Sequence, residues 1–209
     1  MCSTNHKVSL GFVKEKVCEG THLCLVFTDH KERVDSLLKF LLAGMQEDDR
    51  TACFSDEISE KTIKDFFKEN HISYDERKEK EAITFGKASE VYFENNTFDP
   101  DRMLGILEKF YKDSKEKGFT ASRVIGEMSP QIESIEGGDR LLEYECRVTQ
   151  LLEKCPVTAV CQYNANLFDG ATIMEVLKVH PKMIVNGAVV ENPFYIKPAE
   201  YLESMQNKK

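Results

Sequence analysis

The 209-residue sequence predicts an α/β fold: a three-layer sandwich whose mainly parallel central sheet has helices on both faces and an antiparallel hairpin at its C-terminal edge. Two observations predict this class. Five apolar segments of strand length alternate with helical patterns, and strands separated by helices need crossover connections, which make a parallel sheet buried on both faces. Near the C-terminus, Asn186-Gly187 separates two short apolar runs, which is a strong hairpin signal.

The elements follow in order along the chain. The predicted strands are short and apolar, at residues 23–27, 51–54, 82–85, 122–126 and 157–162. Apolar residues recur at helical spacing within residues 34–45, 63–70, 99–118, 141–152 and 173–177. Asp29 and Glu32 form the predicted capping box of the first helix. The third helix begins at Asp99 with Pro100 in its first turn and ends at Gly118.

Composition bounds the domain organisation and the class of partner. We expect one domain over residues 21–197, an N-terminal extension over residues 1–20 and a C-terminal tail over residues 198–209. The net charge of −8, with no stripe of basic residues, argues against direct nucleic-acid binding. No apolar run approaches the roughly 20 residues that span a bilayer, and no secretory signal precedes the domain, so we expect a cytoplasmic protein with no membrane partner.

The seven cysteines show no C-x-x-C pair and fall mostly in predicted strands and helices. In a reducing compartment such cysteines are small core residues, and zinc sites normally show tighter ligand spacing. The sequence therefore predicts reduced cysteines and no metal site, and it makes no prediction of a cofactor.

Ligands of open parallel sheets bind beyond the carboxyl ends of the strands. The residues expected to line such a site are Thr28, Asp29, Ser55, Glu127, Ser129, Gln162 and Tyr163. A nucleotide site would need a glycine-rich loop with a lysine after the first strand, but that position reads Phe-Thr-Asp-His-Lys-Glu. Because Asp29 would repel phosphate, we expect a different class of ligand.

Glu145 is the most informative single residue of the sequence. It follows Leu141 by four positions and precedes Val148 by three, which places it on the stripe of its helix that should be buried. A buried carboxylate needs a partner. Two interpretations stay open: Glu145 forms a structural ion pair with Arg123, Arg140 or Arg147, or it faces Glu127 and the two carboxylates form a cation, amine or shared-proton site.

Two histidines suggest a second site. His22 precedes the first strand and His180 follows the fifth helix, so both should lie at the amino-end rim of the sheet. The alternative for each is an ordinary structural histidine with satisfied hydrogen bonds.

Six segments together resemble the MEDS family, the methanogen and methylotroph sensory domain of the dichloromethane-regulator type. They are His-Leu-Cys-Leu-Val-Phe at 22–27, Phe-Asp-Pro-Asp-Arg-Met at 98–103, Gly-Glu-Met-Ser at 126–129, Arg-Leu-Leu-Glu-Tyr-Glu at 140–145, Pro-Val-Thr-Ala-Val-Cys-Gln-Tyr at 156–163 and His-Pro at 180–181. The resemblance covers roughly residues 21–197. It implies a RecA-like fold without a phosphate loop, and it carries over His22, Glu127, Glu143, Tyr144, Glu145, Gln162, Tyr163 and His180.

The resemblance also implies a sensory role for small organic or hydrocarbon-derived signals, without ATPase activity. Pro130 stands where an aromatic residue is expected in many relatives, which argues against an aromatic wall there. No helix-turn-helix or kinase pattern follows, so we expect the output to pass through a separate kinase or transcription regulator, or through a homodimer. The alternatives are a hydrolase or transferase that uses Glu127 and Glu145 as acid and base or as metal ligands, and an interaction module that binds no ligand.

Overall fold

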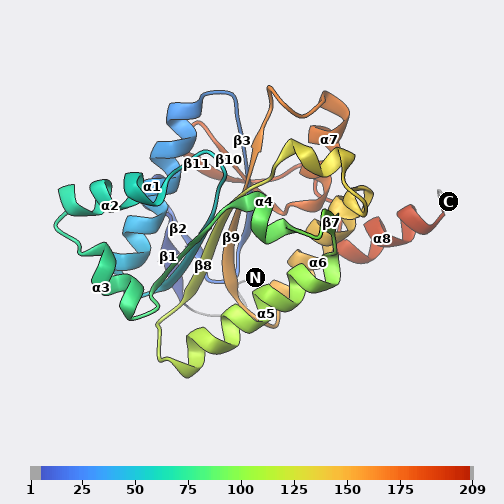
Figure 1. The fold of residues 1–209 in the computed structure, drawn as a ribbon. Helices are drawn as coiled ribbons and strands as arrows, with labels where there is room; N and C mark the ends of the chain where they lie inside the picture. Colours follow the sequence, from blue (N-terminus) through green and yellow to red (C-terminus); the bar gives the residue numbers. More distant parts are fainter. Residues whose placement is uncertain (1–5, 208–209) are drawn as a thin grey trace.

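The computed structural model describes residues 6–207. Within them the central sheet has seven strands in the order β11-β10-β3-β9-β8-β4-β5, and only β11 runs antiparallel to its neighbour. The strands are β3 (His22–Phe27), β4 (Arg50–Phe54), β5 (Ile83–Gly86), β8 (Ser122–Glu127), β9 (Val157–Asn164), β10 (Lys182–Val185) and β11 (Ala188–Glu191). The predicted fold class is confirmed (Figure 1).

The helices form the two outer layers. One face of the sheet carries α1 (His30–Gln46), α2 (Glu60–Glu69) and α3 (Tyr74–Glu79). The other face carries α4 (Ala88–Tyr92), α5 (Pro100–Glu116), α6 (Leu141–Leu152) and α7 (Gly170–Val179). A separate apolar core fills the space on each side of the sheet, and Figure 1 shows the sheet between the two groups of helices.

The sequence patterns did not reveal several short elements. These are helices α3 and α4, β1 (Lys7–Ser9), β2 (Lys16–Cys18), β6 (Phe93–Glu94), β7 (Thr97–Phe98), α8 (Pro198–Gln206) and two 3₁₀ helices, η1 (Pro130–Ser134) and η2 (Gly138–Arg140). The β1–β2 hairpin lies in the extension and packs on α1, where Val8 and Leu10 are fully buried. The tail forms α8, which packs on α6 through the buried Tyr201.

The predicted strands, long helices and hairpin are all present. Asn186 and Gly187 both have positive φ, 50° and 73°, as a two-residue hairpin turn requires. One expectation about the cysteines is wrong, because Cys18 is disulfide-bonded. Among the described residues the free thiols are those of Cys24, Cys53, Cys146, Cys155 and Cys161. No helix within residues 6–207 combines the length and the apolar character that a membrane crossing requires.

Strand β9 contributes side chains to both faces of the sheet. Successive side chains of a strand point to opposite faces of the sheet. Val160 packs in the core under α1, and the Gln162 amide donates to the Arg33 carbonyl oxygen of α1. Cys161 and Tyr163 point the other way, toward α6. Neighbouring residues of one strand therefore serve two different environments.

Candidate functional site

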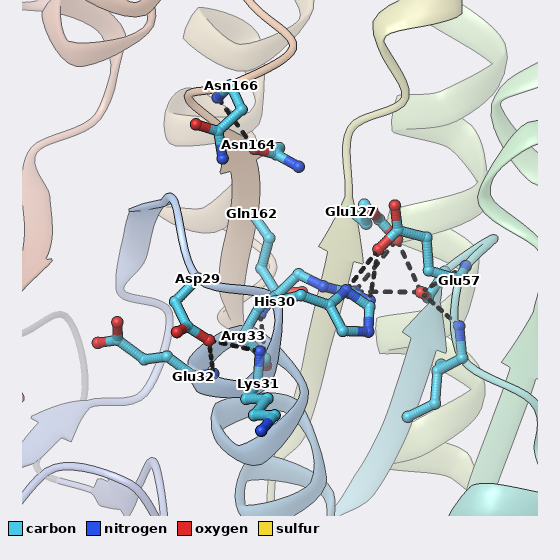
Figure 2. A network of polar contacts seen from close by, with 12 residues as sticks. Asp29, His30, Lys31, Glu32, Arg33, Glu57, Glu127, Gln162, Asn164 and Asn166 are labelled. Atoms are coloured by element: carbon cyan, nitrogen blue, oxygen red, sulfur yellow. Dashed lines mark hydrogen bonds and ion pairs between the residues drawn. The ribbon is translucent and has the colours of Figure 1, made fainter.

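At the carboxyl edge of the sheet, a buried arginine binds two carboxylates and a serine hydroxyl. Arg33 of α1 has no exposed surface, and its guanidinium donates to Glu127 Oε2 at 3.1 Å and to Ser55 Oγ at 3.2 Å. The Ser55 hydroxyl in turn donates to Glu127 Oε2 at 2.7 Å. Arg33 also binds Glu57 Oε2 at 3.1 Å, and His30 Nδ1 lies 2.9 Å from the same oxygen. Figure 2 shows Arg33 together with Glu127 and Glu57; one oxygen of Glu127, Oε2, accepts from both Arg33 and Ser55.

The other residues predicted at this edge have local structural roles. The Asp29 carboxylate caps α1 by accepting from the backbone N–H groups of Lys31 and Glu32, which also lowers the pKa of Asp29. Ser129 caps the first 3₁₀ helix in the same way. Thr28 is exposed, and its carbonyl oxygen accepts from Asn166.

The predicted pairing of Glu127 with Glu145 is wrong. Glu127 lies beside Gln162 in the parallel register, on the face covered by α1. Glu145 of α6 accepts a hydrogen bond from the Tyr163 hydroxyl on the opposite face. Because the sheet lies between the two carboxylates, they share no proton and no ion.

The alternative ion pairs of Glu145 do not form either. Arg140 and Arg147 both bind Glu143, at 2.8 and 3.0 Å. Arg123 binds Asp49 on the other side of the sheet. Besides the Tyr163 hydroxyl, the partners of Glu145 are two histidines and a cysteine, which form a cluster that the local sequence pattern did not reveal.

This cluster consists of His22, Glu145, Cys161 and His180, and we call it the HECH cluster. His22 Nε2 lies 3.3 Å from Glu145 Oε2 and 3.4 Å from Cys161 Sγ. His180 Nε2 lies 3.6 Å from Glu145 Oε2, and Cys161 Sγ lies 3.6 Å from the same oxygen. The two imidazole rings are 4.2 Å apart between centroids. His22 and His180, predicted as a separate site, therefore belong together with Glu145.

The hydrogen bonds around the HECH cluster orient both imidazoles. His180 Nδ1 contacts the Val176 carbonyl oxygen at 2.8 Å, so this nitrogen carries the proton and Nε2 holds the lone pair. The Thr149 hydroxyl donates to the Val179 carbonyl oxygen and therefore accepts from His22 Nδ1, at 2.9 Å. The Nε2 atoms of both rings consequently point into the cluster.

Burial and charge shift the acid–base properties of these groups in different directions. Burial alone would raise the pKa of Glu145, but the hydrogen bond from His22 and the charges of both histidines lower that pKa to about 2. Burial lowers the pKa of His180 to about 4. Burial, together with the neighbouring Glu145 carboxylate, raises the pKa of the Cys161 thiol well above its usual value. On the other face, burial raises the pKa of Glu127.

A cavity of about 470 Å³ lies on the same face, between the sheet, α4 and α5. Its floor consists of small strand residues, including Ala52, Gly126, Ala159 and Cys161. The remaining apolar lining consists of aromatic side chains, Phe54, Tyr92, Phe110 and Tyr144, and of aliphatic ones, among them Met103, Leu107 and Val148. Of the residues that the sequence predicted for a ligand site, none lines this cavity; Tyr144 was carried over only by the resemblance. Small residues in otherwise bulky β-strands are the signal that could have indicated it.

The strand order, with helices on both faces of a mainly parallel sheet, defines a RecA-like α/β domain. Two solved structures share this fold. The KaiC-like protein PH0186 from Pyrococcus horikoshii OT3 has a TM-score of 0.60 and 14% identity, over 86% of this chain and 80% of that one. The flagellar accessory protein FlaH from Methanocaldococcus jannaschii has a TM-score of 0.57 and 10% identity, over 82% and 75%.

The match to a family model is more specific than the similarity of fold. Residues 21–181 match the family described as MEDS, the MEthanogen/methylotroph, DcmR Sensory domain, and the chain belongs to this family. The resemblance that the six sequence segments indicated is thereby confirmed. A comparison with curated proteins finds no match. The family supports a sensory role, and the RecA-like neighbours support the fold alone.

Proposed function

We propose that this chain senses a small apolar organic molecule, which binds in the cavity beside α5, and relays the binding event to a separate signalling protein. The observation that carries the proposal is the cavity itself. Its volume of about 470 Å³ lies in the range of roughly 300 to 1,000 Å³ that is typical of small-molecule sites. Its lining of aromatic and aliphatic side chains suits a ligand with little polarity.

Two arginines of the cavity lining support the same ligand class. Arg50 and Arg102 lie among its lining residues, but both guanidinium groups already donate to backbone carbonyl oxygens. Arg50 also stacks on the ring of Phe110, at 4.9 Å from the centroid. With these cations engaged by the protein, the cavity offers an apolar ligand better complementarity than it offers an anion.

The start of α1 supports a role other than nucleotide hydrolysis. Backbone N–H groups at a helix N-terminus after the first strand are the usual cradle for phosphate. Here the Asp29 carboxylate occupies the N–H groups of Lys31 and Glu32. The rival enzyme hypothesis needs Glu127 and Glu145 as a facing pair, and the sheet separates them.

Helix α5 can transmit a structural change from the cavity to the surface. This helix follows β7, and the Phe98 N–H of β7 donates to the Glu136 carbonyl oxygen at 2.8 Å. Gly137, at φ +80°, lies so close to the Phe98 carbonyl oxygen that an added Cβ would be 2.2 Å away. We propose that a ligand which moves α5 also moves residues 129–138, and that the partner recognises this segment.

Benzene is a suitable probe because it binds dry apolar cavities. We expect it to raise the melting temperature of the full chain and to give saturation-transfer NMR signals. Ala52→Leu, which fills the floor of the cavity, should abolish both effects. Cys53→Val enlarges the side chain of the next residue, which faces the core under α1, and should leave both effects intact. Equal benzene binding by Ala52→Leu and the wild type would contradict the proposal, as would no binding by the wild type.

A further inference from the structure

The HECH cluster contains the ligand types of a transition-metal site. Two imidazole nitrogens, one carboxylate oxygen and one sulfur all lie within 4.8 Å of one another. Imidazole and thiolate select zinc and its neighbours among the first-row metals, whereas calcium and magnesium prefer sites made of oxygen. The donor set therefore favours a borderline-soft divalent ion.

Four of the six separations between these atoms match those of a tetrahedral site. Zinc binds nitrogen and oxygen at about 2.0 to 2.2 Å and sulfur at about 2.3 Å, so tetrahedral ligands lie about 3.3 to 3.6 Å from one another. The contacts of His22 Nε2 with Glu145 Oε2 and Cys161 Sγ measure 3.3 and 3.4 Å. Those of Glu145 Oε2 with His180 Nε2 and Cys161 Sγ both measure 3.6 Å.

An unsatisfied nitrogen gives independent support. His180 is completely buried, and among the described residues its Nε2 atom has no hydrogen-bond partner. Its lone pair faces Glu145 Oε2 at 3.6 Å, and a lone pair directed at a carboxylate repels it. The hydrogen bond from His22 to Glu145 leaves this contact unrelieved. A divalent cation at the centre would satisfy all four ligand atoms at once.

The surrounding contacts are those that hold metal ligands in place. Metal-binding histidines usually donate their second N–H to a protein oxygen, which fixes the ring and its tautomer. His22 donates to Thr149, and His180 donates to the Val176 carbonyl oxygen. The second oxygen of Glu145 accepts from the Tyr163 hydroxyl.

We propose that His22, Glu145, Cys161 and His180 bind one divalent transition-metal ion, zinc in the first instance. On binding, the Cys161 thiol releases its proton to solvent. The carboxylate and the thiolate then balance the two positive charges, so the buried site is neutral as a whole. A second cavity, lined by polar residues such as Glu19, Thr21 and Thr149, reaches His22 from the amino edge of the sheet and provides a route for the ion.

The proposal does not depend on the ligand of the apolar cavity. Cys161 nevertheless lines that cavity, so the metal would lie directly beneath its floor. A ligand that contacts Cys161 would then be in contact with the metal site. Removal of the metal and filling of the cavity can be tested separately.

The test is a titration of the metal-free full chain with Co²⁺ and with Zn²⁺. We expect about one ion per chain and a thiolate-to-cobalt charge-transfer band in the near ultraviolet. Cys161→Ser should remove the band, and His180→Gln should weaken binding by at least about tenfold. Cys53→Ser, at a buried cysteine under α1, should behave as the wild type.

Two further measurements test the proposal even if a variant at one of the four buried positions fails to fold. Thr149→Val leaves all four ligands in place and should weaken binding by about 10- to 100-fold, through loss of the hydrogen bond to His22. X-ray absorption at the zinc edge of the wild type should show one sulfur and two imidazoles among the ligands. A folded wild type that takes up no ion, or whose ion has no sulfur ligand, would overturn the proposal.

Discussion

Arg33 illustrates how much a single buried side chain decides in this protein. It is fully buried and contacts Glu127, Ser55 and Glu57. A buried charge without its partner is costly, whereas an ion pair replaced as a whole by apolar groups often costs little. The role of Glu127 is therefore to neutralise Arg33, and the pair should be treated as one unit.

We expect Arg33→Met to lower the free energy of unfolding by about 3 to 5 kcal/mol, because Glu127 then remains buried without its cation. Urea denaturation measures this change. The double variant with Glu127→Met should recover most of the loss. Lys61→Ala, which removes an exposed partner of Asp65, should change stability by less than about 1 kcal/mol. A double variant that loses the sum of the two single losses would contradict this account.

At the scale of the element, the first turn of α1 depends on its cap. The N–H groups of Glu32 and Lys31 stabilise the anionic Asp29 and lower its pKa below the ordinary value of 3.8. A lowered pKa means that the charged cap stabilises the fold fully above that ordinary value. This stabilisation is lost as the pH falls through the lowered pKa.

Asp29→Ala should therefore lower the melting temperature at neutral pH, and Asp29→Asn should retain most of it because asparagine caps helices well. The remaining difference between the wild type and Asp29→Asn should shrink as the pH falls. Thermal unfolding followed by circular dichroism at several pH values measures it. Asp35→Asn, an exposed change within the same helix, serves as the control. A difference that grows on acidification would show that the cap does not act through its charge.

At the scale of the whole molecule, one sheet joins two apolar cores. Leu41 lies in the core under α1, and Leu152 lies in the core under α6. Because the strands belong to both cores, damage on one side should destabilise the entire domain. The HECH cluster and the apolar cavity lie on one side only.

We expect Leu41→Ala and Leu152→Ala each to cost about 2 to 5 kcal/mol and to leave a single unfolding transition. The chain has no tryptophan, so tyrosine fluorescence and far-ultraviolet circular dichroism are suitable probes. Coincident curves from both probes would confirm cooperative unfolding. Separate transitions in Leu152→Ala would show that the side with the cavity unfolds independently.

The local patterns of the sequence determined the class of fold. Alternation of apolar strands with helical patterns, the cap at Asp29 and the turn at Asn186-Gly187 all correspond to elements in the structure. Each depends on residues within a few positions of one another, where backbone sterics and local hydrogen bonds decide the outcome. The inward position of Glu145 was also predictable, because helical periodicity alone places it on the buried stripe.

Only the tertiary structure decided which partner each buried group meets. Glu127 and Glu145 lie 18 positions apart, yet the sheet separates them, whereas His22 and His180 lie in contact. Strand order and the alternation along β9 place these groups, and neither is encoded in short-range spacing. The residues of the HECH cluster come from β3, α6, β9 and the end of α7, so no motif of closely spaced residues predicted the cluster. Proximity between distant segments follows from how the layers pack, which is why this site became visible only in the folded chain.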